Sequence, residues 1–232
     1  MQLLELLHGS DHVIRHPKYN EGKIHNDYGR GFYCTQDFSL AGEWACKTNA
    51  NGFINKYSID IEGMKILDLC DGTHTVLEWI AILLKNRTFR LNGNIAEDVR
   101  QYIIENFAIN ISKYDLVRGY RADDSYFQYA EAFVENALSV EGLAKARALG
   151  NLGIQIALTS KKSFQRIEFQ EGIPVSKEEY YPGFVRRDDE ARRGLKKISQ
   201  GRSSYRDELF AIDIIREEMK KDDERIQRIV SC

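Results

Sequence analysis

The sequence lacks the features that mark membrane-spanning and disulfide-bonded proteins. No apolar run approaches the roughly 20 residues that a membrane-spanning helix requires. The first residues carry no basic segment ahead of a long apolar stretch, so we expect no secretion signal. The cysteines are scattered without a Cys-x-x-Cys pair: Cys34, Cys46, Cys70 and Cys232. This argues against a disulfide scaffold and a structural zinc site, and we expect a cytoplasmic protein with no membrane partner and no metal.

A large excess of either charge is also missing. The chain has 33 Lys and Arg against 35 Asp and Glu, for a net charge of −2, so any electrostatic partner must meet a local patch. Its hydrophobic fraction of 43% and charged fraction of 29% are ordinary for a folded globular protein. There is no internal repeat and no low-complexity segment. The 232 residues can hold one mid-sized domain with a core, or a domain and an extension.

Three regions differ in the spacing of their apolar residues. Residues 1–69 have the short or alternating apolar runs of strands, with one helix expected over 39–48. Residues 72–150 carry apolar residues at three- and four-residue spacing, as amphipathic helices do, interrupted by a strand pattern at 114–120. Residues 152–172 are expected to form a strand, a loop and a second strand.

The last region, after Pro174, is strongly charged and its pattern favours helices. Leu209, Ile212, Ile215 and Met219 have helical spacing, so a helix there must bury an apolar stripe against the main domain or a partner. We therefore expect an α+β fold. A domain over 1–173, with a helical insertion over about 72–150, precedes a charged helical extension over 174–232.

Two short motifs carry a family resemblance. "LLHGSD" is followed about twenty residues later by "DYGRGFYCTQDFSLAGEWA". These segments resemble the first two motifs of the ADP-ribosyltransferase superfamily, in its diphtheria-toxin and poly(ADP-ribose) polymerase branch. A group of bacterial proteins that share "DYGRGFY" and "RADDSYF" is the closer likeness. The resemblance implies a split antiparallel β-sheet that forms a cleft for NAD.

The resemblance assigns roles to the first-motif residues and to two aromatics. The backbone N–H and C=O of Gly9 would pair with the nicotinamide amide, since no Cβ blocks a close approach. His8 would bond the adenine-side ribose and Ser10 the nicotinamide amide. Tyr33 and Trp44, eleven positions apart as in the family, would pack on the nicotinamide ring, where an aromatic pair gains about 0.5–1.5 kcal/mol beyond area burial.

Other residues near the second motif have weaker assignments. Gly31 belongs to the Gly-x-Gly pattern before Tyr33, and Arg30 could meet the pyrophosphate of NAD. Arg30, Asp27 and Tyr28 could equally belong to a loop that only caps the site. Ala41 stands where a serine often contacts the amide in the family.

The third motif departs from the family pattern. Where members that transfer ADP-ribose usually have Glu at the start of a late strand, this chain has Gln155, which brings no negative charge to the developing cation. Asp123 or Asp124 could supply that charge, although Asp124 could also be a helix N-cap.

The expected activity is loss of nicotinamide from NAD and transfer of ADP-ribose to a protein or nucleic-acid acceptor. The resemblance also implies a toxin-like effector, in some cases encoded beside a small neutralising antitoxin protein. The alternatives are an NAD glycohydrolase, a non-catalytic module that binds NAD or ADP-ribose, and, ranked last, an RNA 2′-phosphotransferase. Between Arg186 and Arg206, eight basic residues stand against three acidic ones, and this surplus could contact nucleic-acid phosphates or form a solvated helix face.

Overall fold

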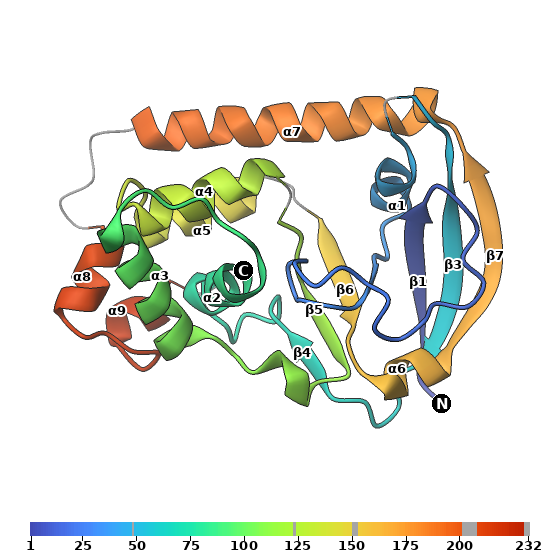
Figure 1. The fold of residues 1–232 in the computed structure, drawn as a ribbon, viewed down its shortest axis with the longest axis horizontal. Coiled ribbons are helices and arrows are strands. Elements are labelled where there is room, and N and C mark those ends of the chain that lie inside the picture. The colour runs from blue at the N-terminus through green and yellow to red at the C-terminus, as the bar shows by residue number, and fades with distance from the viewer. Residues whose placement is uncertain (48, 123, 150–152, 201–207, 230–232) are drawn as a thin grey trace. The chain divides into compact units, whose positions relative to one another are not determined.

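The computed structural model describes residues 1–47, 49–122, 124–149, 153–200 and 208–229 (Figure 1). The chain forms two compact units, each built from separate stretches of sequence. The first contains Met1–Asp68, Ile111–Arg121 and Gly153–Arg187, and the second contains Leu69–Asn110, Ala122–Leu152 and Asp188–Cys232.

Strands of the first unit form two sheets within the described residues. One sheet is antiparallel, in the order β1 (Leu3–Ser10), β3 (Gly52–Asp60), β7 (Ile167–Val175). The other has the order β2 (Phe32–Cys34), β6 (Ile154–Leu158), β5 (Leu116–Tyr120), β4 (Ile66–Asp68). A mixed α+β fold is therefore confirmed. The expectation of antiparallel sheets is wrong for one pairing, because β4 runs parallel to β5.

A buried cluster joins residues from both sheets. The cluster is explained by the alternation of apolar residues along the strands, since every second residue of a strand faces the same side. Its members are Leu6, Cys34, Tyr57, Ile59, Leu116, Ile156 and Leu158.

In the described residues, one pair bridges the backbones of the two sheets. Leu7 and Thr35 exchange both backbone hydrogen bonds, at 2.8 Å each. Beyond this pair β1 continues along β3, whereas β2 pairs with β6. The two sheets of the first unit therefore diverge from His8 onward, and this place is called the split below.

Helix α1 (Phe38–Ala45) packs on β1 next to this split (Figure 1). Its N-cap is Asp37, whose Oδ1 accepts hydrogen bonds from the backbone N–H groups of Ser39 and Leu40 at 2.9 and 3.1 Å. The helix predicted over 39–48 is thus present.

The connection between β6 and β7 was expected to be a loop, but it is the six-residue helix α6 (Lys161–Arg166). The Ser160 hydroxyl caps it, accepting from the Ser163 N–H at 3.2 Å. The segment is too short for an apolar period to indicate a helix, so the cap was the available signal.

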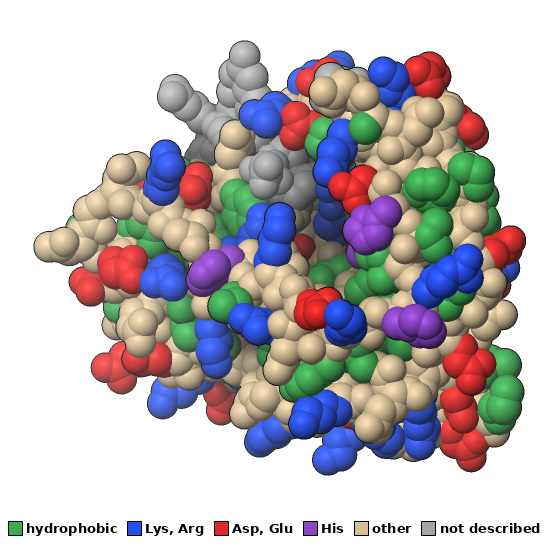
Figure 2. All heavy atoms as spheres, turned by 45° about the vertical axis from the view of Figure 1, so that its right-hand side comes forward, with side chains coloured by type: hydrophobic (Ala, Val, Ile, Leu, Met, Phe, Trp, Pro, Cys, Tyr) green, Lys and Arg blue, Asp and Glu red, His purple; other side chains and the backbone are tan. Residues whose placement is uncertain are grey.

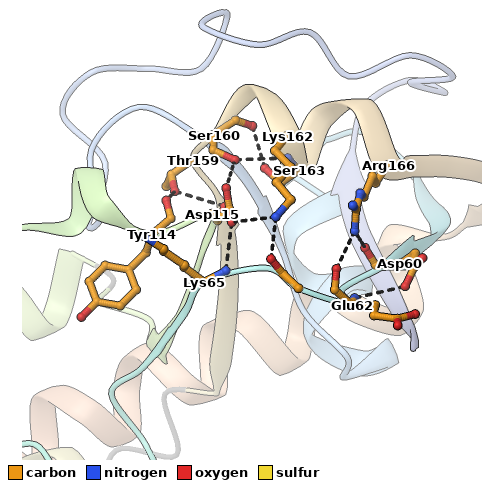
Figure 3. A network of polar contacts seen from close by, with 11 residues as sticks. Asp60, Glu62, Lys65, Tyr114, Asp115, Thr159, Ser160, Lys162, Ser163 and Arg166 are labelled. Carbon is orange, nitrogen blue, oxygen red and sulfur yellow. Dashed lines mark hydrogen bonds and ion pairs between the residues drawn. The ribbon is translucent and has the colours of Figure 1, made fainter. Parts of the chain in front are cut away.

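A polar network around Asp115 holds the ends of β5 and β6 and the segment before β4 together (Figure 3). The Asp115 carboxylate accepts from the Ser160 hydroxyl at 2.6 Å and from the Lys65 N–H at 2.9 Å. Burial raises the pKa of this carboxyl. The two hydrogen bonds and the charges of Lys162 and Lys65 outweigh that effect, so the pKa lies below its ordinary value of 3.8.

Helix α7 (Lys177–Gln200) follows β7, and the division between the two units falls after its residue Arg187. Its first half is anchored to α1. The Arg187 guanidinium donates to both carboxylate oxygens of Glu43, at 3.0 and 2.9 Å, and both side chains are largely buried. Tyr180 packs against Gly42, where a Cβ would lie 2.2 Å from its ring.

The second unit is helical. Its helices are α2 (Val76–Asn86), α3 (Asn94–Phe107), α4 (Asp124–Val134), α5 (Val140–Leu149), α8 (Ala211–Arg216) and α9 (Glu224–Gln227). Trp79 of α2 is fully buried. The stripe predicted after residue 208 is only partly right. Leu209 and Met219 are buried, but α8 ends at Arg216 and buries Ile214 rather than Ile212 and Ile215. None of the helices in the described residues is long and apolar enough to cross a membrane.

Candidate functional site

The last residues of β1 form one side of the candidate site. The N–H and C=O of Leu7 both point toward Thr35, away from β3. Backbone groups of alternate residues in a strand point to the same side, so those of Gly9 also point away from β3. The strand on that side of Gly9 is β2, which pairs with β6 and not with β1; its Tyr33 lies opposite Ala157 of β6. The Gly9 amide groups therefore lie at the split edge of the sheet.

His8 lies beside the split and contacts β2. Its Nδ1 is 2.6 Å from the backbone carbonyl of Tyr33, and its ring lies 4.3 Å from the ring of Phe32. A carbonyl oxygen only accepts, so Nδ1 carries the proton and Nε2 is an acceptor in the neutral ring. Burial lowers the pKa of His8 below 6.5; the bond to the Tyr33 carbonyl opposes this effect in part, and the charge of His12 adds the smallest contribution, a further lowering. The ring is therefore held neutral, in one tautomer.

Gly9 is also required by packing. A Cβ at this position would lie 2.0 Å from the carbonyl oxygen of Ala41 and 2.8 Å from Cβ of Trp44. The absence of a side chain thus lets α1 and Trp44 approach β1. The Trp44 side chain is partly exposed, and its Nε1 is buried without a hydrogen-bond partner among the described residues. The Arg121 guanidinium lies 5.8 Å from the Trp44 ring, within cation–π range.

Tyr33 is held by the loop that precedes β2. Its hydroxyl donates to the Gly29 carbonyl at 2.6 Å and accepts from the Tyr28 N–H at 3.0 Å. The rings of Tyr28 and Tyr33 are nearly parallel at 6.5 Å. The Tyr28 hydroxyl donates to the Tyr120 carbonyl at 2.7 Å. These bonds fasten the loop to β5.

Gln155 makes a contact that the sequence did not predict. Its Nε2 donates to Asp27 Oδ2 at 2.6 Å and to the Tyr120 carbonyl at 3.3 Å. Asp27 is 5% exposed and Gln155 4%. A buried carboxylate is costly unless it is hydrogen-bonded or paired with a charge. In the sequence, however, Asp27 stands in a polar loop, and nothing near it indicates that it is buried or that Gln155 is its partner.

Ser10 faces the other way, toward β3. Its hydroxyl donates to the His12 carbonyl at 2.5 Å and accepts from Asn55 Nδ2 at 2.9 Å. Asn55, fully buried on β3, also binds the Ile14 N–H through Oδ1 at 2.8 Å. Asn55 thus shapes the turn after β1. A polar residue at an inward position of the strand pattern could have identified it.

The remaining predicted site residues are Arg30, Gly31, Asp123 and Asp124. Arg30 is exposed, and its Nη1 donates to the Asn20 carbonyl at 2.8 Å. Gly31 directly precedes β2. Asp123 lies outside the described residues. Asp124 is the first residue of α4, in the second unit.

Basic residues after Arg186 are partly neutralised. Besides the pair of Arg187 with Glu43, Arg192 contacts Asp188 at 2.9 Å. Arg202 and Arg206 lie outside the described residues. On the face drawn in Figure 2, basic and acidic side chains are interspersed. Both interpretations of the basic segment remain predictions.

The described residues contain no cluster of three His, Cys, Asp or Glu side chains that could hold a metal.

One surface pocket has a lining that contains none of the predicted site residues. It is lined by Arg15, His16, Pro17, Phe164, Ile167, Glu168 and Phe169. None of the residues singled out from the sequence belongs to it.

Comparison with known proteins gives one match. A family model described as "Protein of unknown function (DUF3990)" matches residues 4–169. This range contains all of β1 but its first residue, β2 to β6, α1 and the Asp27–Gln155 contact. No curated protein and no solved structure matches the chain.

Proposed function

The chain belongs to the DUF3990 family, and from the geometry at the end of β1 we propose that it is an ADP-ribosyltransferase with NAD as its substrate. The reaction releases nicotinamide and transfers ADP-ribose to a protein or nucleic-acid acceptor. The observation that carries the proposal is the split at Leu7 and Thr35, which turns the amide groups of Gly9 toward an edge from which β2 has diverged. A carboxamide needs one donor and one acceptor side by side, and one strand residue supplies both.

His8 and Trp44 support the same assignment. Nε2 of neutral His8 is an acceptor for a ribose hydroxyl, since Nδ1 is occupied by the Tyr33 carbonyl. Trp44 lies next to Gly9 and offers a partly exposed indole ring and a buried N–H. A flat aromatic ligand would stack on this ring. Ser10 would have to leave Asn55 and His12 to bond the nicotinamide amide, so in this proposal it shapes the turn instead.

The test is incubation of the purified protein with NAD labelled on the adenylate in a cell lysate. Nicotinamide release and transferred label are followed together, and the products are divided between nuclease and protease treatment. Label that resists protease but not nuclease identifies a nucleic-acid acceptor, and the opposite result a protein acceptor. Measurable NAD binding without any nicotinamide release would refute the transferase.

A second candidate is a module that binds NAD without catalysis. It is favoured by Gln155, which has an uncharged side chain and is only 4% exposed. Nicotinamide release without label on a macromolecule would instead indicate an NAD glycohydrolase. A Trp44→Ala variant should bind NAD more weakly in all three cases.

A further inference from the structure

We propose that Asp27 supplies the negative charge that Gln155 lacks, by acting through the Gln155 amide as a positioning residue; this inference rests on the proposed transferase function. The two residues are 128 positions apart in the sequence, and Asp27 Oδ2 accepts from Gln155 Nε2 at 2.6 Å. A hydrogen bond to a carboxylate is roughly twice as strong as one between neutral groups. Asp27 is therefore the dominant partner of this amide.

The contact sets which end of the amide remains for a ligand. Nε2 has two hydrogens, and its two neighbours, the Asp27 carboxylate and the Tyr120 carbonyl, are both acceptors. The amide cannot be reversed without placing Oε1 against those oxygens. Gln155 thus keeps Oε1 for a donor such as a ribose hydroxyl, in the role that the family gives to a glutamate oxygen.

The turn that contains Asp27 is closed by bonds of its neighbours. The Gly29 N–H donates to the Asn26 carbonyl at 2.9 Å, which closes a turn around Asp27. Tyr28, 1% exposed, anchors the same turn through its bond to the Tyr120 carbonyl. The backbone that carries Asp27 is therefore held by bonds of its neighbours.

The charge of Asp27 lies one hydrogen bond behind the amide that would face the ribose. In a buried site such bonds polarise one another, so the carboxylate makes Oε1 a better acceptor. A positive charge that develops on the ribose is stabilised by negative charge placed beforehand near it. Asp27 is the carboxylate that the described contacts place against Gln155.

The experiment uses the full-length protein and compares four variants with the wild type by nicotinamide release and by calorimetric NAD binding. Asp27→Asn keeps an acceptor for Gln155 but removes the charge. Gln155→Glu places two carboxylates side by side, where they must share a proton. The third variant, Asp27→Asn with Gln155→Glu, exchanges amide and carboxylate. Glu21→Gln is the matched control, because Glu21 is an exposed carboxylate in the same segment.

We expect kcat to fall about 100-fold in Asp27→Asn with little change in KM, because an electrostatic group placed for the transition state is lost, and to recover in the exchanged variant. Glu21→Gln should match the wild type. Wild-type kcat in Asp27→Asn would overturn the inference while leaving the transferase intact. An exchanged variant that folds and binds NAD but is no faster than Asp27→Asn would also overturn it. If the wild type itself releases no nicotinamide, the proposed function fails instead.

Discussion

Replacement of Gly9 by alanine tests how closely helix α1 packs on β1. The added Cβ would lie 2.0 Å from the Ala41 carbonyl oxygen, 2.6 Å from the Ala45 nitrogen and 2.8 Å from Trp44 Cβ. Favourable contacts between such atoms begin near about 3.5 Å, so α1 must move by more than about 1 Å. Two of the three atoms are backbone, and no change of rotamer relieves the overlap. Overpacking usually costs 1–3 kcal/mol, and we expect about 3 kcal/mol here.

Urea unfolding followed by circular dichroism measures this loss. With a slope of about 1–3 kcal/mol per molar urea, the midpoint should fall by about 1–3 M. The control is Gly63→Ala, at a position with φ of +68° and no atom within 4 Å of an added Cβ, where only backbone strain of about 1–2 kcal/mol is expected. If the Gly9→Ala midpoint equals or exceeds that of Gly63→Ala, the packing argument is refuted.

Four further predictions concern charge and buried polar groups. Acidification below pH 6.5 should lower the free energy of unfolding, because the unfolded chain protonates His8 before the folded one, whose pKa is lowered; in urea titrations the variant His8→Gln should lose less. Arg187→Met leaves Glu43 buried without its bidentate partner and should cost about 3–5 kcal/mol in thermal unfolding; an unchanged melting temperature would contradict this. Asn55→Leu should lower the free energy of unfolding by about 1–3 kcal/mol for each polar group left unpaired, and proteolysis of the turn after β1 should become faster. Cleavage at the wild-type rate would argue against a role of Asn55 in shaping this turn. The pKa of Asp115 is lowered, so its stabilising effect is present above pH 3.8 and is lost as the pH falls through the lowered value; Asp115→Asn should flatten this acid limb.

Local patterns in the sequence determined most of the elements. Apolar residues alternate along residues 53–61, which predicts β3. They recur with helical spacing along residues 74–86, which predicts α2. Asp37, which caps α1, is a residue type that favours this position at the start of a helix. These features depend on neighbours within a few residues, which is the range over which a sequence pattern is informative.

Only the tertiary structure decided which distant residues meet. Asp27 and Gln155 are brought together by the pairing of β2 with β6, and neither residue has a local pattern that names its partner. The parallel pairing of β4 with β5 likewise depends on how the chain returns to the sheet after residues 69–110. Gly9 illustrates both levels. Its sequence motif indicated a place of close approach. The atoms that require a glycine there belong to α1, more than thirty residues later. Local patterns do not determine which helix packs on a strand, because that depends on how all the apolar surfaces of the chain fit together.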